Sequence, residues 1–192
     1  MVSVRNTRQD VIEAAGRLFA EKGYHGTSMR DLGRELGLLG SSLYAHVESK
    51  QDLLVEVVEE GARLFQASAA AAAAAGGSSD ERLRRLIAGH IQVVLENRDV
   101  VRTYLNEARM LDTEHRSRVI AARDAYEQAF RQVIGAGASD ATFRPDLDPK
   151  LSSIFILSIL NALERWYRSD GAVDGRQLVD EVTEFALAGV RR

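Results

Sequence analysis

The stretch LGRELGLLGSSLYAHVESKQDLL, residues 32–54, decides how this chain is interpreted. Gly33 and Gly37 stand four positions apart, the segment 40–46 is short and mostly small or polar, and the pair Ser49 and Lys50 follows. Small residues on a short helix suit a surface that must come close to another macromolecule. A lysine just behind that helix suggests that the macromolecule is negatively charged.

The residues around this stretch carry signals for helix ends. Apolar residues at helical spacing predict a first helix that stops at Gly23. Thr27 or Ser28 is expected to cap the next helix, with Asp31 completing a capping box. Gly37 is expected to end that second helix, because glycine accepts the left-handed conformation of a helix end.

Helical spacing continues through the rest of the chain, and strand-like alternation is hard to find. A short helix is predicted over 41–47, and a long helix is predicted after the cap residue Ser49, running into the alanine-rich segment 67–75. Later helices are expected at about 80–97, from a cap at Asp99 to 108, and at 112–135, 150–168 and 175–190. About nine helices result, so the predicted class is all-α. Residues 1–50 are expected to form a helix-turn-helix head and 51–192 a larger body.

Composition excludes several classes of protein. The 192 residues are 45% hydrophobic and 28% charged, as in ordinary globular proteins, and cysteine is absent, which excludes disulfides and cysteine-based zinc sites. The first ten residues lack the apolar core of a signal peptide, and the apolar run 154–163 is too short to span a bilayer, so a cytoplasmic protein is expected. Net charge is −3, yet residues 1–50 hold seven Lys/Arg against six Asp/Glu.

The two glycines suit a helix-turn-helix whose second helix lies in a DNA major groove. Gly33 is small enough for two helix backbones to meet, and Gly37 suits the turn. The hydroxyl of Tyr44 suits a phosphate contact, and Lys50 combines its charge with a helix N-terminus. The predicted DNA-binding residues are Thr27, Ser28, Arg30, Ser41, Ser42, Tyr44, His46 and Lys50.

Two other classes of function compete with DNA binding. Glycine-containing helix corners are common in proteins that do not bind DNA, so a helical interaction module remains open. An enzyme has less support, because a phosphate-binding glycine loop, a nucleophile elbow and a His-Glu-x-x-His pair are all missing from the sequence. The four histidines are scattered along the chain, and no cofactor or metal ion is expected.

Residues 8–57 resemble the DNA-binding domain of the TetR family of bacterial transcriptional regulators. The resemblance rests on VIEAAGRLFAEKGYHGTSMRDLGRELGL and SSLYAHVESKQDLL. The sequence departs from the family pattern at Val47, where phenylalanine is usual, and at Leu39 and Gly40, where a polar residue and a lysine are frequent. One common DNA contact is therefore missing, and the operator sequence cannot be carried over.

This resemblance implies a homodimer that reads a palindromic operator, usually as a repressor. Such dimers pair their last two helices as a four-helix bundle, here 150–168 and 175–190. These side chains can equally fill the core of one subunit. The apolar candidates for the paired surface are Ile154, Leu157, Leu160, Leu178, Val182, Phe185 and Leu187.

The resemblance also implies a small-molecule effector that is held inside the body and shifts the long helix over 50–75. Polar groups set among apolar helix faces are the candidates for its pocket, although packing or surface exposure is the competing role for each of them. The predicted effector-binding residues are Tyr104, Glu107, Met110, Arg123, Tyr126, Phe130, Asn161 and Trp166.

Two body segments, FRPDLD at 143–148 and ERWYRSDG at 164–171, loosely resemble TetR regulators that answer to acyl-CoA thioesters, including steroid-degradation repressors. This resemblance implies a long apolar tunnel with Arg165, Trp166 and Arg168 near its mouth. Alternatively, Trp166 plugs the core below the 169–175 loop. A drug or antibiotic-like effector is the nearest alternative ligand.

Overall fold

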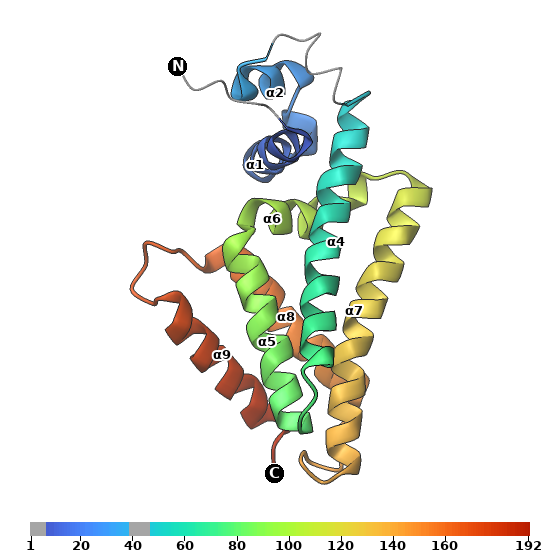
Figure 1. Cartoon of the computed structure of the whole chain (residues 1–192), viewed down its shortest axis with the longest axis vertical. Coiled ribbons are helices and arrows are strands. Elements are labelled where there is room, and N and C mark those ends of the chain that lie inside the picture. The colour runs from blue at the N-terminus through green and yellow to red at the C-terminus, as the bar shows by residue number, and fades with distance from the viewer. Residues whose placement is uncertain (1–6, 39–46) are drawn as a thin grey trace. The chain divides into compact units, whose positions relative to one another are not determined.

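The computed structural model describes residues 7–38 and 47–192, and within these ranges it contains eight α-helices, one 3-10 helix and no strand. The predicted all-α class is confirmed, with eight described helices against about nine expected. The helix predicted over 41–47 lies outside the described residues. The elements are α1 (Arg8–Gly26), α2 (Met29–Leu36), α4 (Lys50–Ala74), α5 (Ser79–Glu96), α6 (Arg98–Asn106), η1 (Ala108–Met110), α7 (Thr113–Ser139), α8 (Pro149–Trp166) and α9 (Gly175–Val190) (Figure 1).

The chain divides into two compact units. The first unit takes the described residues up to Ala62 together with Asp99–Ile120, and the second takes Arg63–Arg98 together with Ala121–Arg192. The boundaries fall inside α4 and α7 and after the first residue of α6, so α4 and α7 each contribute whole turns to both units. The first compact unit therefore combines nearly all of α6 with the N-terminal helices. The functional division after residue 50 stays a prediction.

Side-chain caps fix the starts of several helices, and the sequence predicts those of α2 and α4. Ser28 accepts a hydrogen bond from the Asp31 backbone and the Asp31 carboxylate accepts one from the Ser28 backbone, which confirms the predicted capping box of α2. Equivalent boxes start α1 at Thr7 and α5 at Ser78. The Ser49 hydroxyl accepts from the Asp52 backbone at 3.1 Å, so it caps α4 as predicted.

Gly23 interrupts α1 at the position where the sequence predicts its end, and Gly37 ends α2 as predicted. Gly23 has a φ of 72°, which breaks the helical path within α1. Gly37 has a φ of 64°, and its N–H donates to the Arg34 carbonyl. The Leu38 N–H donates to the Gly33 carbonyl at 2.8 Å, which completes a Schellman motif. A Cβ atom at Gly33 would lie 3.1 Å from the Leu38 carbonyl oxygen, so its small size serves this turn.

In the first unit, α1 packs against α2, and α6 joins both α1 and α4. The Thr103 hydroxyl of α6 donates to the Gly16 carbonyl of α1 at 3.2 Å. A Cβ atom at Gly61 of α4 would lie 2.6 Å from Tyr104 Cβ, so these two helices meet closely at a glycine. The fully or nearly fully buried side chains of this core include Val11, Ala15, Leu18, Phe19, Leu32, Leu53 and Leu54.

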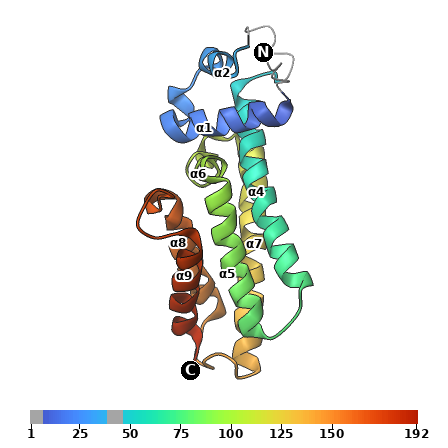
Figure 2. The same cartoon turned by 60° about the vertical axis from the view of Figure 1, so that its left-hand side comes forward.

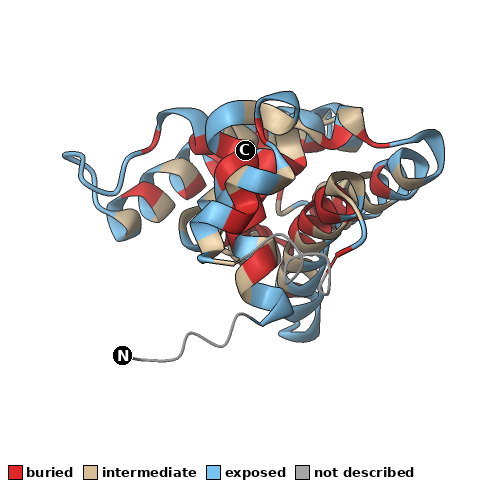
Figure 3. Ribbon diagram, turned by 90° about the horizontal axis from the view of Figure 1, so that it is seen from above, coloured by how far each residue is buried: buried red, intermediate tan, exposed pale blue. Residues whose placement is uncertain are grey.

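In the second unit, α5 packs against both α8 and α9 (Figure 2). Each helix buries one side and exposes the other, as the colouring by burial in Figure 3 shows. The fully buried apolar side chains of this core include Leu83, Ile87, Ile91, Phe130, Ile134, Phe143, Leu160 and Leu163. This pattern follows the helical spacing of apolar residues in the sequence.

Two helix boundaries in the body differ from the prediction. Helix α7 continues to Ser139, beyond the expected end near 135. Gly137 lies within it and has a packing role, because a Cβ atom there would overlap the ring of the buried Phe143. Helix α6 begins at Arg98, so Asp99 stands in its first turn and is not its cap.

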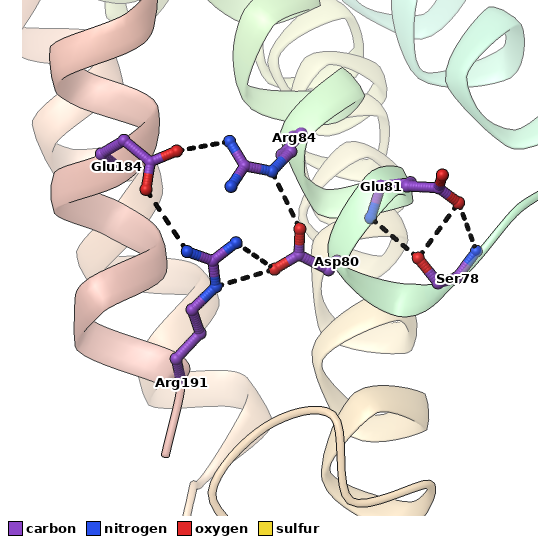
Figure 4. A network of polar contacts seen from close by, with 6 residues as sticks. All are labelled: Ser78, Asp80, Glu81, Arg84, Glu184 and Arg191. Carbon is purple, nitrogen blue, oxygen red and sulfur yellow. Dashed lines mark hydrogen bonds and ion pairs between the residues drawn. The ribbon is translucent and has the colours of Figure 1, made fainter.

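Charged side chains join the start of α5 to the end of α9 (Figure 4). Arg191 donates from Nε and Nη2 to one Asp80 oxygen, at 2.8 and 2.6 Å. Arg84 donates to Asp80 at 2.8 Å and to Glu184 at 2.6 Å. Partial burial opposes ionisation of Asp80, but the hydrogen bonds from Arg84 and Arg191 hold its pKa below the ordinary value. The network fixes the end of α9 against α5.

Candidate nucleic-acid interface and effector site

The start of α4 is tied to the turn between α1 and α2 by one lysine. The Lys50 ammonium donates to the Tyr24 carbonyl at 2.9 Å and to the Thr27 carbonyl at 2.8 Å. It also lies 4.3 Å from the centre of the Tyr24 ring, a cation–π distance. Two of its three donors are therefore used inside the protein. A third N–H and the positive charge of the ammonium lie at the start of α4.

The same turn is held by a second set of contacts. The Tyr24 hydroxyl donates to the Gln51 side-chain oxygen at 2.7 Å, and the Tyr24 backbone N–H donates to Glu107 at 3.2 Å. Burial, followed by the nearby charge of Asp52, raises the pKa of Tyr24. Helix α4 and Glu107, the residue that follows α6, thus both hold the turn that leads into α2.

The DNA-contact residues predicted near the start of α2 separate into two groups. The Thr27 side chain is only 2% exposed, and its hydroxyl lies 3.1 Å from the Leu18 carbonyl oxygen and 3.0 Å from the Gly23 carbonyl oxygen. In this arrangement the hydroxyl stabilises the turn, and the Thr27 side chain does not face outward for the phosphate contact that the sequence predicts. Ser28 and Arg30 are exposed at the first turn of α2. The predicted contacts Ser41, Ser42, Tyr44 and His46 lie outside the described residues.

Three of the predicted effector-binding residues belong to the first unit. Tyr104 is buried against Gly61, and Glu107 accepts the backbone N–H of Tyr24. The Met110 carbonyl oxygen lies 3.4 Å from the Gln51 side-chain nitrogen. Each contact has a structural role within the first unit.

An aromatic cluster occupies the second unit and includes two predicted effector-binding residues. We define it as Phe65 of α4, His90 of α5, and Tyr126 and Phe130 of α7. The His90 ring centre lies 4.6 Å from that of Phe65 and 5.8 Å from that of Tyr126, and the Tyr126 and Phe130 ring centres are 5.5 Å apart. All four side chains are buried. Sequence reasoning did not select His90, although its place in the apolar stripe of α5 was the available signal.

The polar centre of the aromatic cluster is only partly satisfied. His90 Nδ1 lies 3.1 Å from the Tyr126 hydroxyl oxygen. The other ring nitrogen, Nε2, is buried and has no hydrogen-bond partner among the described residues. Complete burial lowers the pKa of His90 to about 3, because the charged imidazolium would lose its hydration. The imidazole is therefore neutral at neutral pH.

The other predicted effector-binding residues have different surroundings. Arg123 and Asn161 are half-buried on α7 and α8. Trp166 is 56% exposed, so it does not plug the core below the 169–175 loop. The next residue, Tyr167, is 8% exposed, and a Cβ atom at Gly175 would lie 3.8 Å from its hydroxyl. Tyr167 therefore fills the position that the alternative interpretation gave to Trp166.

Helices α8 and α9 expose large apolar side chains, which we call the α8–α9 face: Leu151, Ile154, Phe155 and Phe185. Phe155 is 63% exposed and Phe185 is 68% exposed. A groove of about 340 Å³ lies between these helices and the 144–148 segment, with both phenylalanines in its lining. Among the apolar residues predicted for a paired surface, Ile154 and Phe185 are exposed, whereas Leu160, Leu178 and Leu187 belong to the core of the unit. Leu151 and Phe155 were not predicted.

Comparison with known proteins identifies the family. Residues 76–190 match the family described as tetracyclin repressor-like, C-terminal domain, and residues 11–57 match bacterial regulatory proteins, tetR family. The chain belongs to the tetR family. The family that the sequence predicts is therefore confirmed. The relatives of this tetR-family protein are transcriptional regulators.

The HTH-type transcriptional repressor KstR2 of Mycobacterium tuberculosis is 27% identical over 190 residues, which is 98% of this chain and 95% of KstR2. A solved structure of this ketosteroid transcriptional regulator has a TM-score of 0.92, at 26% identity over 98% of this chain and 97% of that one. PfmR, a TetR-family transcriptional regulator of Thermus thermophilus, is 32% identical over 95% of this chain and 99% of its own, with a TM-score of 0.86.

A third structure shares the fold at lower identity. AibR was solved in complex with isovaleryl coenzyme A and operator DNA, and it is 24% identical over 93% of this chain and 96% of its own, with a TM-score of 0.84. Within the described part of the tetR-family chain, none of the helices has the length and apolar character needed to cross a membrane. The same residues contain no cluster of three or more histidine, aspartate or glutamate side chains suited to a metal ion.

Proposed function

We propose that this protein is a homodimeric repressor that binds a palindromic operator in the cytoplasm and is released by a small, largely apolar effector, with acyl-CoA thioesters as the effector class. The observation that carries the proposal is the joint match of residues 11–57 and 76–190 to the two halves of one regulator family. Nearly the whole chain is accounted for by a DNA-binding part and an effector-binding part, with the DNA-binding part assigned to residues 1–50.

For DNA recognition, Ser41, Ser42 and His46 are assigned to base readout in the major groove and Tyr44 to a phosphate. The exposed Ser28 and Arg30 contact the sugar-phosphate backbone near the start of α2. Lys50 adds its charge at the start of α4, where the exposed N–H groups of the helix also favour a phosphate. Phosphate contacts of this kind release counterions, so affinity falls steeply as salt concentration rises.

The α8–α9 face supports the homodimer. Large apolar side chains that are exposed together usually mark an interface, and homodimer interfaces are more apolar than other surfaces. A twofold axis would bring Phe155 and Phe185 of one subunit against the same two residues of the other. Two recognition helices placed about one DNA turn apart would then read both halves of a palindrome.

Acyl-CoA thioesters are proposed as effectors because KstR2 is a ketosteroid regulator and AibR was solved with isovaleryl coenzyme A. The exposed Trp166 and the neighbouring Arg165 and Arg168 suit the nucleotide end of such a molecule, by stacking and by charge. Helix α4 belongs to both compact units, so it is the element through which an effector would act. An effector releases the operator only if it binds the two states of α4 with different affinity.

The test starts with selection of operator duplexes from a randomised pool. Fluorescence anisotropy then follows the complex while CoA thioesters, free fatty acids and antibiotics are added singly. Release by thioesters supports the proposal. Release by antibiotics and not by thioesters would replace the effector class with a drug-like one. Failure to enrich any duplex would overturn DNA binding itself.

A further inference from the structure

The aromatic cluster contains a polar atom that the described protein leaves unsatisfied. His90 is 1% exposed, and its Nε2 has no hydrogen-bond partner among the described residues. An unpaired polar group in a protein interior costs free energy, and such atoms are normally satisfied by protein, an ordered water or a ligand. The atom therefore requires a partner from outside the described protein, either an ordered water or a ligand.

The hydrogen bond with Tyr126 determines whether Nε2 of His90 is a donor or an acceptor. A phenol hydroxyl is a good donor, and the unprotonated nitrogen of a neutral imidazole is a good acceptor. We therefore assign the hydrogen bond at 3.1 Å to donation from Tyr126 to Nδ1 of His90. In that tautomer the proton of the ring is on Nε2, so the unsatisfied atom is a donor that seeks an oxygen acceptor.

The surroundings within the aromatic cluster favour an uncharged acceptor. Phe65 and Phe130 supply apolar faces within the same cluster, and the hydroxyl of Tyr126 lies 3.1 Å from Nδ1. Burying a carboxylate in such surroundings costs far more than burying a carbonyl group, unless a cation lies opposite it. The neutral imidazole does not supply that cation.

Room for an apolar group lies one helical turn from the cluster. A small cavity of about 40 Å³ is lined by residues of α4, α5 and α7, mostly alanine, leucine and valine, with Arg82 and Gln132 as its polar members. Ala69 follows Phe65 by four positions, Leu86 precedes His90 by four, and Ala129 follows Tyr126 by three. Helix geometry therefore places the cavity next to the cluster on all three helices.

We propose that the Nε2–H of His90 donates a hydrogen bond to an uncharged carbonyl oxygen of the effector, with Tyr126 as the positioning residue and the adjoining alanine-lined cavity as the place for the apolar part next to that carbonyl. This inference rests on the proposed effector-responsive function. It adds that the carbonyl itself, and not only the apolar bulk of the molecule, is recognised.

A pair of probes that differ only at the carbonyl tests this directly. Octanoyl-CoA has a thioester carbonyl, and the thioether S-octyl-CoA lacks that oxygen. Calorimetry with the full-length protein should give an affinity for octanoyl-CoA that is roughly tenfold or more higher, because the thioether leaves the buried donor unpaired. Equal affinity for the two probes would overturn the role of His90 and leave the acyl-CoA effector standing.

Variants of His90 and Tyr126 test whether these two residues are responsible for the difference in affinity between the two probes. His90→Phe keeps an aromatic ring but removes the donor, so its affinities for the two probes should become equal. Tyr126→Phe frees Nδ1, and discrimination should fall by a smaller factor. His25→Gln, an exposed histidine of the first unit, should discriminate as the wild type does. Full discrimination retained in His90→Phe would contradict the proposal.

A spectroscopic measurement on the wild type does not depend on the folding of any variant. Nitrogen-15 resonances of the histidine rings should show His90 protonated on Nε2, and octanoyl-CoA should shift that resonance while S-octyl-CoA shifts it much less. An identical response to both probes would mean that only water reaches the atom. If neither probe binds while operator binding is intact, both the thioester effector class and this inference fail, and the DNA-binding function survives.

Discussion

The ammonium nitrogen of Lys50 lies 2.8 Å from the carbonyl oxygen of Thr27, at the turn that leads into α2. A second bond to Tyr24 holds the other side of the same turn. The first residue of α4 is therefore fixed to the chain between α1 and α2. A displacement of the start of α4 would strain these two bonds unless the turn moved with it.

The first prediction concerns this lysine. Lys50→Met keeps the length of the side chain but loses its charge and donors. We expect the free energy of unfolding to fall by about 1–3 kcal/mol, because two carbonyl groups lose a charged donor. Affinity for every duplex should also fall, and the slope of log affinity against log salt should decrease by about one. An unchanged slope would show that Lys50 has only a structural role.

Thr27→Val provides the matched control at the same turn. The substitution keeps the shape of the side chain and removes a buried hydroxyl that bonds within α1. Unfolding in urea should show a loss of stability of about 1 kcal/mol. The salt slope of DNA binding should stay as in the wild type, because this side chain is buried. A decreased slope would restore Thr27 as a phosphate contact.

The α8–α9 face gives a prediction about assembly. A glutamate at Phe155 or Phe185 would place buried, unpaired charges on both sides of a twofold interface. Phe155→Glu and Phe185→Glu should therefore sediment as monomers at micromolar concentration, where the wild type sediments as a dimer. Ile120→Glu makes the same change at another exposed apolar residue, which is 52% exposed and lies in the first unit. That variant should remain dimeric, and a wild-type monomer would contradict the proposed assembly.

The free energy of unfolding at acid pH should depend on the protonation of His90. The unfolded chain takes up a proton on this residue near pH 6.5, whereas burial lowers the pKa in the folded chain to about 3. Its contribution to stability is therefore complete above pH 6.5 and is lost as pH falls toward 3, with a loss of about 2 kcal/mol by pH 5. Carboxylates with lowered pKa values, such as Asp31 and Asp80, contribute in the same direction but at lower pH.

The variant His90→Phe should be nearly insensitive to pH between 6.5 and 5, and His25→Gln should follow the wild type. Urea titrations at fixed pH values measure the difference. If His90→Phe loses stability with acid as steeply as the wild type, then the buried histidine is not the cause.

The sequence predicts the helices of this protein well wherever local chemistry determines them. Ser28 and Asp31 form their capping box, and Gly37 ends α2, because such caps depend on residues only three or four positions apart. Gly137 lies beyond the predicted helix end near 135, whereas its actual constraint is Phe143, whose position depends on tertiary packing. Local signals do not contain that information.

The candidate sites were predicted less completely for the same reason. Thr27 has the residue type and the chain position of a phosphate ligand, but its hydroxyl turns inward to α1. Trp166 is exposed and Tyr167 is buried, although either aromatic residue suits the core by its composition. His90 was overlooked because its significance comes from Tyr126, which is 36 positions away in the sequence.

Selection of duplexes from a randomised pool tests the central claim most directly, with the wild type compared with Ser41→Ala, Ser42→Ala and His46→Ala. The account predicts that the wild type enriches a palindrome whose half-sites lie about one DNA turn apart, and that each variant prefers a different sequence within those half-sites. Octanoyl-CoA should lower the affinity for the selected duplex. Enrichment of no palindrome, or the same preference in all three variants, would contradict the account.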